Sequence, residues 1–187
     1  MLAWLLLNKS YKVLAGAAAA LAISILATWA IDPAAWTQYA AMMRGSGIQQ
    51  EPIPCVSIVL RQYVSPRSMW LQYLPAALGC AWGLVYFWKR RHSWEWLRDG
   101  GLLMLVSILV APYSWIVDQV LAIPALLDGA YRTSSQLLLV LLVVATIVLE
   151  AELLTGVKLS SLLFLWSAPA WLVWYLVAHG RAQTANR

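Results

Sequence analysis

Long uninterrupted apolar runs are the feature that most constrains how this chain can fold. A helix needs about 20 apolar residues to cross the ~30 Å hydrocarbon core of a bilayer. Four stretches meet this requirement, at residues 13–31, 69–88, 136–154 and 160–178. The composition agrees, because 11% of the residues are charged, against about 25% in a typical soluble domain. The sequence therefore predicts an all-α, polytopic membrane protein.

Two shorter apolar runs, at residues 96–111 and 115–130, bring the prediction to about six transmembrane helices in one membrane domain, 1–187. A Pro-Tyr-Ser segment at 112–114 separates them, and its proline favours a break. At 1.5 Å per residue the run before the break reaches only ~24 Å. We therefore expect the break to lie below the membrane surface, against protein or a water-filled cavity. The alternative is a pair of longer, regular helices.

The distribution of lysine and arginine predicts the topology. Alternate loops receive nine of these residues on one side and four on the other. The larger set is Lys9, Lys12, Lys89, Arg90, Arg91, Arg98, Arg132, Arg181 and Arg187, and the smaller is Arg44, Arg61, Arg67 and Lys158. By the positive-inside rule, both termini are expected in the cytoplasm of a multi-pass protein of the plasma (inner) membrane. The loop 32–68 is then external.

The net charge of +5 is interpreted as this topology signal, so nucleic acid is not an expected partner. Membrane lipids are the expected partners, with anionic lipid favoured at the basic run 89–92. Cys55 and Cys80 are too few for a disulfide framework, and the two histidines, His92 and His179, are expected at the headgroups. No metal-binding spacing or cofactor motif is present, so neither a metal nor a cofactor is predicted.

Asp118 is the best candidate for a functional side chain, because it lies among apolar residues just after the break. A carboxylate in a membrane helix is costly and often functional. The alternative is structural: Ser114 could cap the helix, and a negative charge in the first turn is stabilised by the helix dipole. Both interpretations of Asp118 stay open.

The external loop contains two further candidates, Arg61 and Arg67. The segment 33–43 is expected to lie on the membrane surface, and 53–64 is expected to form a second short helix that brings Arg61 towards the next helix. Arginine suits phosphate because its planar guanidinium offers a fork of donors. Arginines that simply extend to lipid headgroups are the alternative.

The stretch Leu109–Leu127, LVAPYSWIVDQVLAIPALL, resembles a segment of glycosyltransferase family 87, in which Pro, an aromatic residue or His, Ser and Trp precede an Asp. The order of elements from Lys9 to Trp88 is similar as well. The resemblance implies a GT-C-type fold and transfer of a sugar from a polyprenyl-phosphate carrier to an acceptor on the external face. It implies a donor site at the following residues: Asp118, Tyr113, Ser114, Trp115, Arg61 and Arg67.

The resemblance covers the C-terminal half of such enzymes, whose catalytic carboxylate belongs to the first external loop of the N-terminal half. The apolar Met1–Leu7 is accordingly interpreted as the remnant of a preceding helix, and a second chain supplying the missing helices is a possible partner. Asp32, directly after the first long run, is the remaining candidate for the catalytic base.

Two other functions stay open. The chain could be a non-catalytic membrane subunit that completes the fold of another protein. It could also be a small transporter, although such proteins usually have paired broken helices in two repeated halves, and only one broken pair is predicted here.

Overall fold

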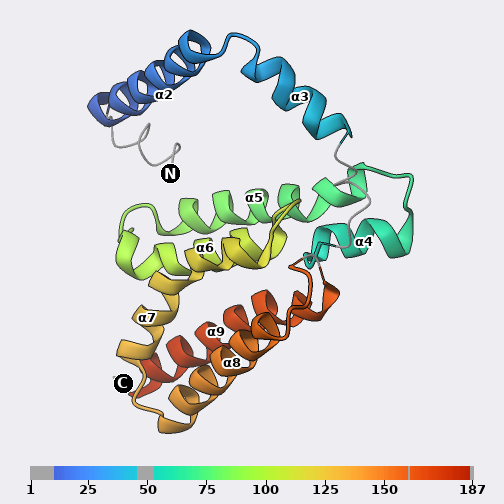
Figure 1. Cartoon of the computed structure of the whole chain (residues 1–187). Helices are drawn as coiled ribbons and strands as arrows, with labels where there is room; N and C mark the ends of the chain where they lie inside the picture. Colours follow the sequence, from blue (N-terminus) through green and yellow to red (C-terminus); the bar gives the residue numbers. More distant parts are fainter. Residues whose placement is uncertain (1–10, 46–52, 160, 186–187) are drawn as a thin grey trace. The chain divides into compact units, whose positions relative to one another are not determined.

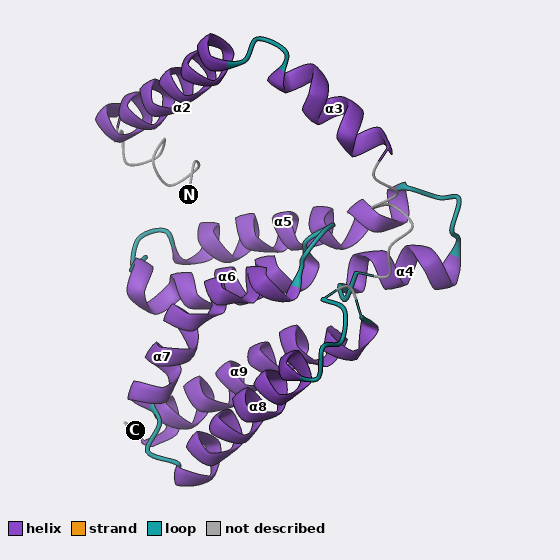
Figure 2. Cartoon of the chain, viewed as in Figure 1, coloured by secondary structure: helices purple, strands orange, loops and turns teal. Residues whose placement is uncertain are grey.

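The computed structural model describes residues 11–45, 53–159 and 161–185, and all regular elements in these ranges are helical (Figure 1, Figure 2). The predicted all-α class is therefore confirmed for the described part of the chain. Met1–Leu7, the predicted helix remnant, lies outside the described residues. The chain divides into two compact units, Met1–Glu51 and Pro52–Arg187.

The first unit contains α2 (Tyr11–Ile31) and α3 (Ala35–Gly45). None of the α2 residues is buried, as expected for an apolar helix whose surroundings are lipid or another protein. Its polar side chains satisfy themselves locally: Ser24 Oγ and Thr28 Oγ1 each donate to the carbonyl four residues earlier, both at 2.9 Å. The short helix α3 covers most of the segment 33–43, whose predicted position on the membrane surface remains a prediction.

The second unit contains the remaining described elements. In chain order they are α4 (Val56–Val64), α5 (Trp70–Arg90), α6 (Trp96–Val110), η1 (Ile116–Ala122), α7 (Ile123–Arg132), α8 (Gln136–Leu154), η2 (Leu162–Trp166) and α9 (Ser167–Ala185). The elements η1 and η2 are 3₁₀ helices, which the sequence did not predict. A 3₁₀ helix rises ~2.0 Å per residue instead of ~1.5 Å. The helical stretch after the break is therefore longer than a regular α-helix with the same number of residues.

Among the described residues, three helical stretches are long and apolar enough to cross a membrane: Tyr11–Ile31, Gln136–Leu154 and Leu162–Gly180. These support the membrane assignment. Helix α5 has 21 residues, but its tryptophans, tyrosines, glutamine and Pro75 lower its hydropathy. Helix α6 has 15 residues and reaches only ~22 Å. A total of about six transmembrane helices remains a prediction.

The core of the second unit lies where α6, η1 and α7 pack against α9. Its buried side chains are Leu105, Ile108, Ala122, Ala125, Leu138, Trp171, Trp174, Tyr175 and Ala178. Gly101 and Gly129 make the packing close, because a Cβ atom on Gly101 would lie 2.9 Å from Tyr175 Oη and one on Gly129 would lie 2.9 Å from Trp174 Cζ3. Helix α8 joins this core through Trp174 Nε1, which donates to Leu138 O at 2.7 Å.

Candidate functional site

The break between α6 and η1 is the centre of the candidate site. Helix α6 ends at Val110, and Ala111 is extended, with ψ of 137°, as expected for a residue that precedes proline. A Cβ atom on Gly79 would lie 2.5 Å from Val110 Cγ2, so the end of α6 lies against Gly79. Gly79 is nine residues after Trp70, or ~14 Å along α5. Helix α6 therefore ends well short of the first residue of α5.

Side chains from α4 and α5 satisfy the carbonyl groups that the break leaves without helical partners. Ser57 Oγ donates to Val110 O at 3.2 Å, and Gln72 Nε2 donates to Pro112 O at 2.8 Å. Both side chains are fully buried. The break is thus held against protein, and its depth in the membrane remains a prediction. Helix α4 is the element that makes this possible, because it packs on both α5 and α6.

Arg61 lies in the same layer as these polar groups. It is one helical turn after Ser57 on the buried face of α4, and only 4% of the residue is exposed. Its Nη1 donates to Met69 Sδ at 3.0 Å, and a thioether is a weak acceptor. A guanidinium can donate a charge-assisted pair of hydrogen bonds to a phosphate group. Arg67, in contrast, is exposed in the turn before α5.

Tyr113 and Ser114 complete the layer around the break. Ser114 is buried, and Tyr113 lies next to the Tyr73 side chain of α5. The structure therefore brings three predicted donor-site residues, Arg61, Tyr113 and Ser114, to one end of α5 and α6. It adds Gln72, whose Oε1 is buried without a hydrogen-bond partner.

Asp118 adopts the structural role that the sequence analysis left open. Its Oδ2 accepts a hydrogen bond from the Trp115 backbone N–H at 2.8 Å, and the residue is exposed. The cap of η1 is Trp115 and not Ser114, so the predicted cap was one residue too early. A carboxylate three residues after the cap stabilises the first turn in this way. A contact between Asp118 and a substrate remains a prediction.

Asp32 belongs to the first unit, where its Oδ1 accepts from the Ala34 N–H at 2.8 Å. This bond starts the turn that leads into α3. The assignment of Asp32 as a catalytic base remains a prediction.

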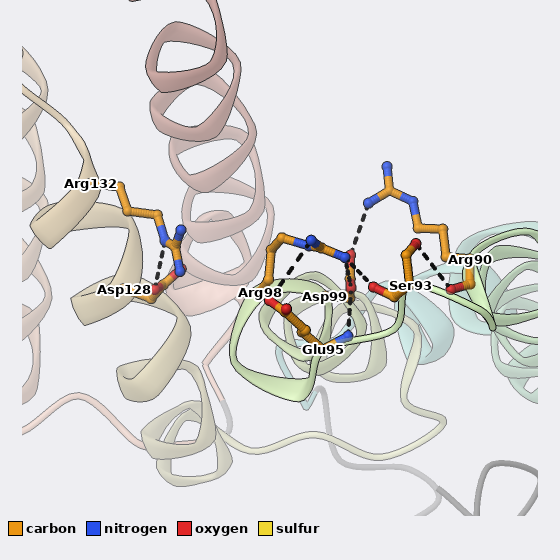
Figure 3. Close-up of polar contacts among 7 residues, drawn as sticks. All are labelled: Arg90, Ser93, Glu95, Arg98, Asp99, Asp128 and Arg132. Carbon is orange, nitrogen blue, oxygen red and sulfur yellow. Dashed lines mark hydrogen bonds and ion pairs between the residues drawn. The ribbon is translucent and has the colours of Figure 1, made fainter. Parts of the chain in front are cut away.

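The opposite end of α5 and α6 contains a polar group that the sequence analysis did not single out. Asp99 is fully buried in the first turn of α6, and both Arg90 and Arg98 contact its carboxylate (Figure 3). Arg98 and Asp99 are adjacent in the sequence at the start of a predicted helix, where the helix dipole stabilises an acidic residue. This pattern could have indicated the arrangement. Among the described residues, no group of three or more His, Cys, Asp or Glu side chains could hold a metal ion.

Cys55 reports on how tightly the break is packed. Burial raises the pKa of the Cys55 thiol above its ordinary value, although nearby backbone N–H groups, including that of Ser114, and Arg61 partly oppose the shift. Because the thiolate is the reactive form, a raised pKa makes the cysteine less reactive at neutral pH. In a Cys80→Ala background, we expect a water-soluble maleimide to label Cys55 at least about tenfold more slowly than a cysteine introduced by Arg67→Cys.

The pH dependence of labelling gives a second readout. A folded-state pKa above the ordinary value means that the Cys55 rate should keep rising with pH after the rate at Arg67→Cys has levelled off, across about pH 7 to 10. Equal rates and equal pH profiles for the two cysteines would contradict a closed packing of α4 on the break.

Comparisons with protein-family models, curated proteins and solved structures found no match to this chain.

Proposed function

We propose that this chain is a membrane protein that binds a polyprenyl-phosphate-linked sugar at the break between α6 and η1, as the lipid-phosphate side of a glycosyltransferase. The observation that carries the proposal is the burial of Arg61 on α4, one helical turn after Ser57, whose hydroxyl donates to Val110 O at the break. The resemblance of Leu109–Leu127 to glycosyltransferase family 87 supports the same site. In this proposal the break faces the external side of the membrane and both termini are cytoplasmic.

A phosphate at this position would match the groups that surround the break. Arg61 would supply a charge-assisted pair of hydrogen bonds, and the Tyr113 hydroxyl and Gln72 amide lie in the same layer. The polyprenyl chain would lie along the apolar surface of the helices, where Val117, Val120 and Leu121 are exposed on η1. In a transfer reaction Arg61 would stabilise the negative charge that develops on the departing lipid phosphate.

The second candidate is a non-catalytic membrane subunit, and one observation favours it. In the described part of the second unit, Asp118 is the carboxylate nearest to the break in sequence, and it already caps η1. A transferase needs a base that takes the proton of the attacking hydroxyl. If the break binds lipid-linked sugar and the chain alone transfers none, the base comes from another chain and not from Asp32.

The test is binding of a radiolabelled polyprenyl-phosphate hexose to the full chain in nanodiscs. Arg61→Ala is expected to weaken binding by about tenfold or more, because a hydrogen bond to a charged group contributes ~1.5–3 kcal/mol. Arg61→Lys should recover part of the affinity, since it keeps the charge but loses the planar fork. The resemblance also implied Arg67, but the site proposed here leaves it out because it is exposed, six residues after Arg61. Arg67→Ala is therefore the matched control, and it should bind as the unmodified chain does.

Thermal unfolding of each variant separates loss of binding from loss of fold. A folded Arg61→Ala variant with unchanged affinity would exclude Arg61 from the donor site. Equal losses in Arg61→Ala and Arg67→Ala would indicate general attraction of the lipid phosphate and not a site at the break.

A further inference from the structure

A polar group of described residues lies at the end of α5 and the start of α6, away from the break. We call it the Asp99 clamp, defined as Asp99, Arg90 and Arg98. Arg90 Nη1 lies 2.9 Å from Asp99 Oδ1, and Arg98 Nη2 lies 2.9 Å from Oδ2 (Figure 3). The Glu95 N–H also donates to Oδ2, at 3.1 Å. Two guanidinium groups thus share one buried carboxylate, which leaves an excess positive charge.

The clamp fixes its arginines in position without burying them. The side chains of Arg90 and Arg98 are 49% and 39% exposed, whereas that of Asp99 is 1% exposed. Arg90 also lies over the Tyr86 ring, 4.9 Å from its centroid. An arginine that is already ordered loses less side-chain entropy when it binds a ligand.

Arg91 extends this basic surface onto an exposed aromatic ring. Its guanidinium lies 4.2 Å from the centroid of Trp88, which is 57% exposed. Its Nε donates to His92 Nε2 at 3.0 Å. These contacts use the face of the guanidinium and one of its three nitrogens. Among the described residues, no hydrogen bond involves its two terminal nitrogens.

The charges around the clamp do not balance. Lys89, Arg90, Arg91 and Arg98 carry four positive charges, and Glu95 and Asp99 carry two negative ones, so the net charge is +2 with His92 neutral. In the same part of the chain, the rings of Phe87 and Trp96 each form a T-shaped contact with Trp94, with centroids 5.1 and 5.3 Å apart. Exposed arginines next to Trp and Tyr are typical of the headgroup layer of a membrane, where phosphate is the complementary group.

We propose that Arg91, on the exposed ring of Trp88, binds the phosphate of one anionic phospholipid headgroup, and that the charge of Arg90, held by the Asp99 clamp, adds to the attraction. The ligand class is a phospholipid with net negative charge. A zwitterionic lipid would also present its own cation to the same arginines, so its binding would be weaker. This site is independent of the proposed binding of a lipid-linked sugar, because it lies at the other end of α5 and α6.

The experiment measures thermal unfolding of the full chain in detergent, with added phosphatidylglycerol or phosphatidylcholine. A ligand that binds only the folded state raises the unfolding temperature. We expect phosphatidylglycerol to raise it by about 4 °C more than phosphatidylcholine does. Arg91→Gln should remove at least half of this difference, and Lys89→Gln should remove less, because Lys89 takes no part in the ring and clamp contacts.

Arg67→Gln is the matched control, because it also removes one exposed positive charge. It should keep the full difference between the two lipids. The proposal would be overturned if Arg91→Gln kept the full difference in unfolding temperature between the two lipids. It would also be overturned if Arg67→Gln lost as much of this difference as Arg91→Gln, because that would indicate diffuse attraction. Inorganic phosphate should have no effect; a shift as large as that of phosphatidylglycerol would mean that the site binds a free anion and not a lipid.

Discussion

Replacing Trp171 with alanine is expected to destabilise the second unit by about 3–5 kcal/mol, the usual cost of deleting a buried tryptophan side chain. Trp171 is 5% exposed, at the centre of the core formed by α6, η1, α7 and α9. Its Nε1 donates to Gln119 Oε1 at 2.8 Å, and Gln119 Nε2 donates to Ser167 Oγ at 2.6 Å. The substitution leaves both a cavity and an unpaired amide oxygen, and lipid offers no water to satisfy that oxygen.

The measurement is the free energy of unfolding in mixed detergent and sodium dodecyl sulfate, followed by circular dichroism. Trp171→Phe separates the two contributions, because it keeps most of the ring but removes the donor, and should cost about 1–3 kcal/mol. Trp70→Ala is the control, since Trp70 is 63% exposed, and should change stability by less than about 0.5 kcal/mol. Equal effects of Trp171→Ala and Trp70→Ala would contradict the core described above.

Most helices could be predicted from the sequence because the length of an apolar run is a local property. The expected boundaries 69–88, 96–111 and 136–154 lie within two residues of those of α5, α6 and α8. The break at Pro112 was equally local, since proline lacks the N–H that a continuing helix needs. The 3₁₀ form of η1 and η2 was not predicted, because it depends on how the first turn packs against neighbouring helices.

The candidate site could be predicted only in part. The sequence placed Arg61 on a short helix near the next apolar run, and α4 has that position. It did not indicate that Ser57 and Gln72 would donate to the carbonyls of Val110 and Pro112. Such partners come from segments 40 to 53 residues away, and only the folded chain determines which polar side chains reach an unsatisfied carbonyl.

The Asp99 clamp was missed for a related reason. The run 89–92 was interpreted as a lipid anchor on the strength of its charge alone, and Arg98 was counted only as a topology signal. The structure uses Arg90 and Arg98 to neutralise a buried carboxylate, and this requires α5 and α6 to be antiparallel neighbours. The short connection between the two helices, together with an acidic residue in the first turn of the second, was the available signal.

Asp99→Ala is expected to destabilise the chain by about 2–4 kcal/mol. This is the lower part of the range for breaking a buried charge pair, because both arginines keep some contact with solvent. The carboxylate accepts from Arg90, from Arg98 and from the Glu95 N–H, so its removal disconnects the end of α5 from the start of α6. Asp99→Asn should cost less, since its amide oxygen can still accept one of these bonds.

Glu95→Ala is the control for Asp99→Ala in the same unfolding measurement. The Glu95 carboxylate lies 3.8 Å from Arg98 and its side chain is 71% exposed, so its loss should cost less than about 1 kcal/mol. In a double-mutant cycle, Asp99→Ala and Arg90→Ala should be less than additive, because either change alone already breaks their contact. Additive effects would mean that Arg90 contributes to stability mainly through Tyr86 and not through the clamp.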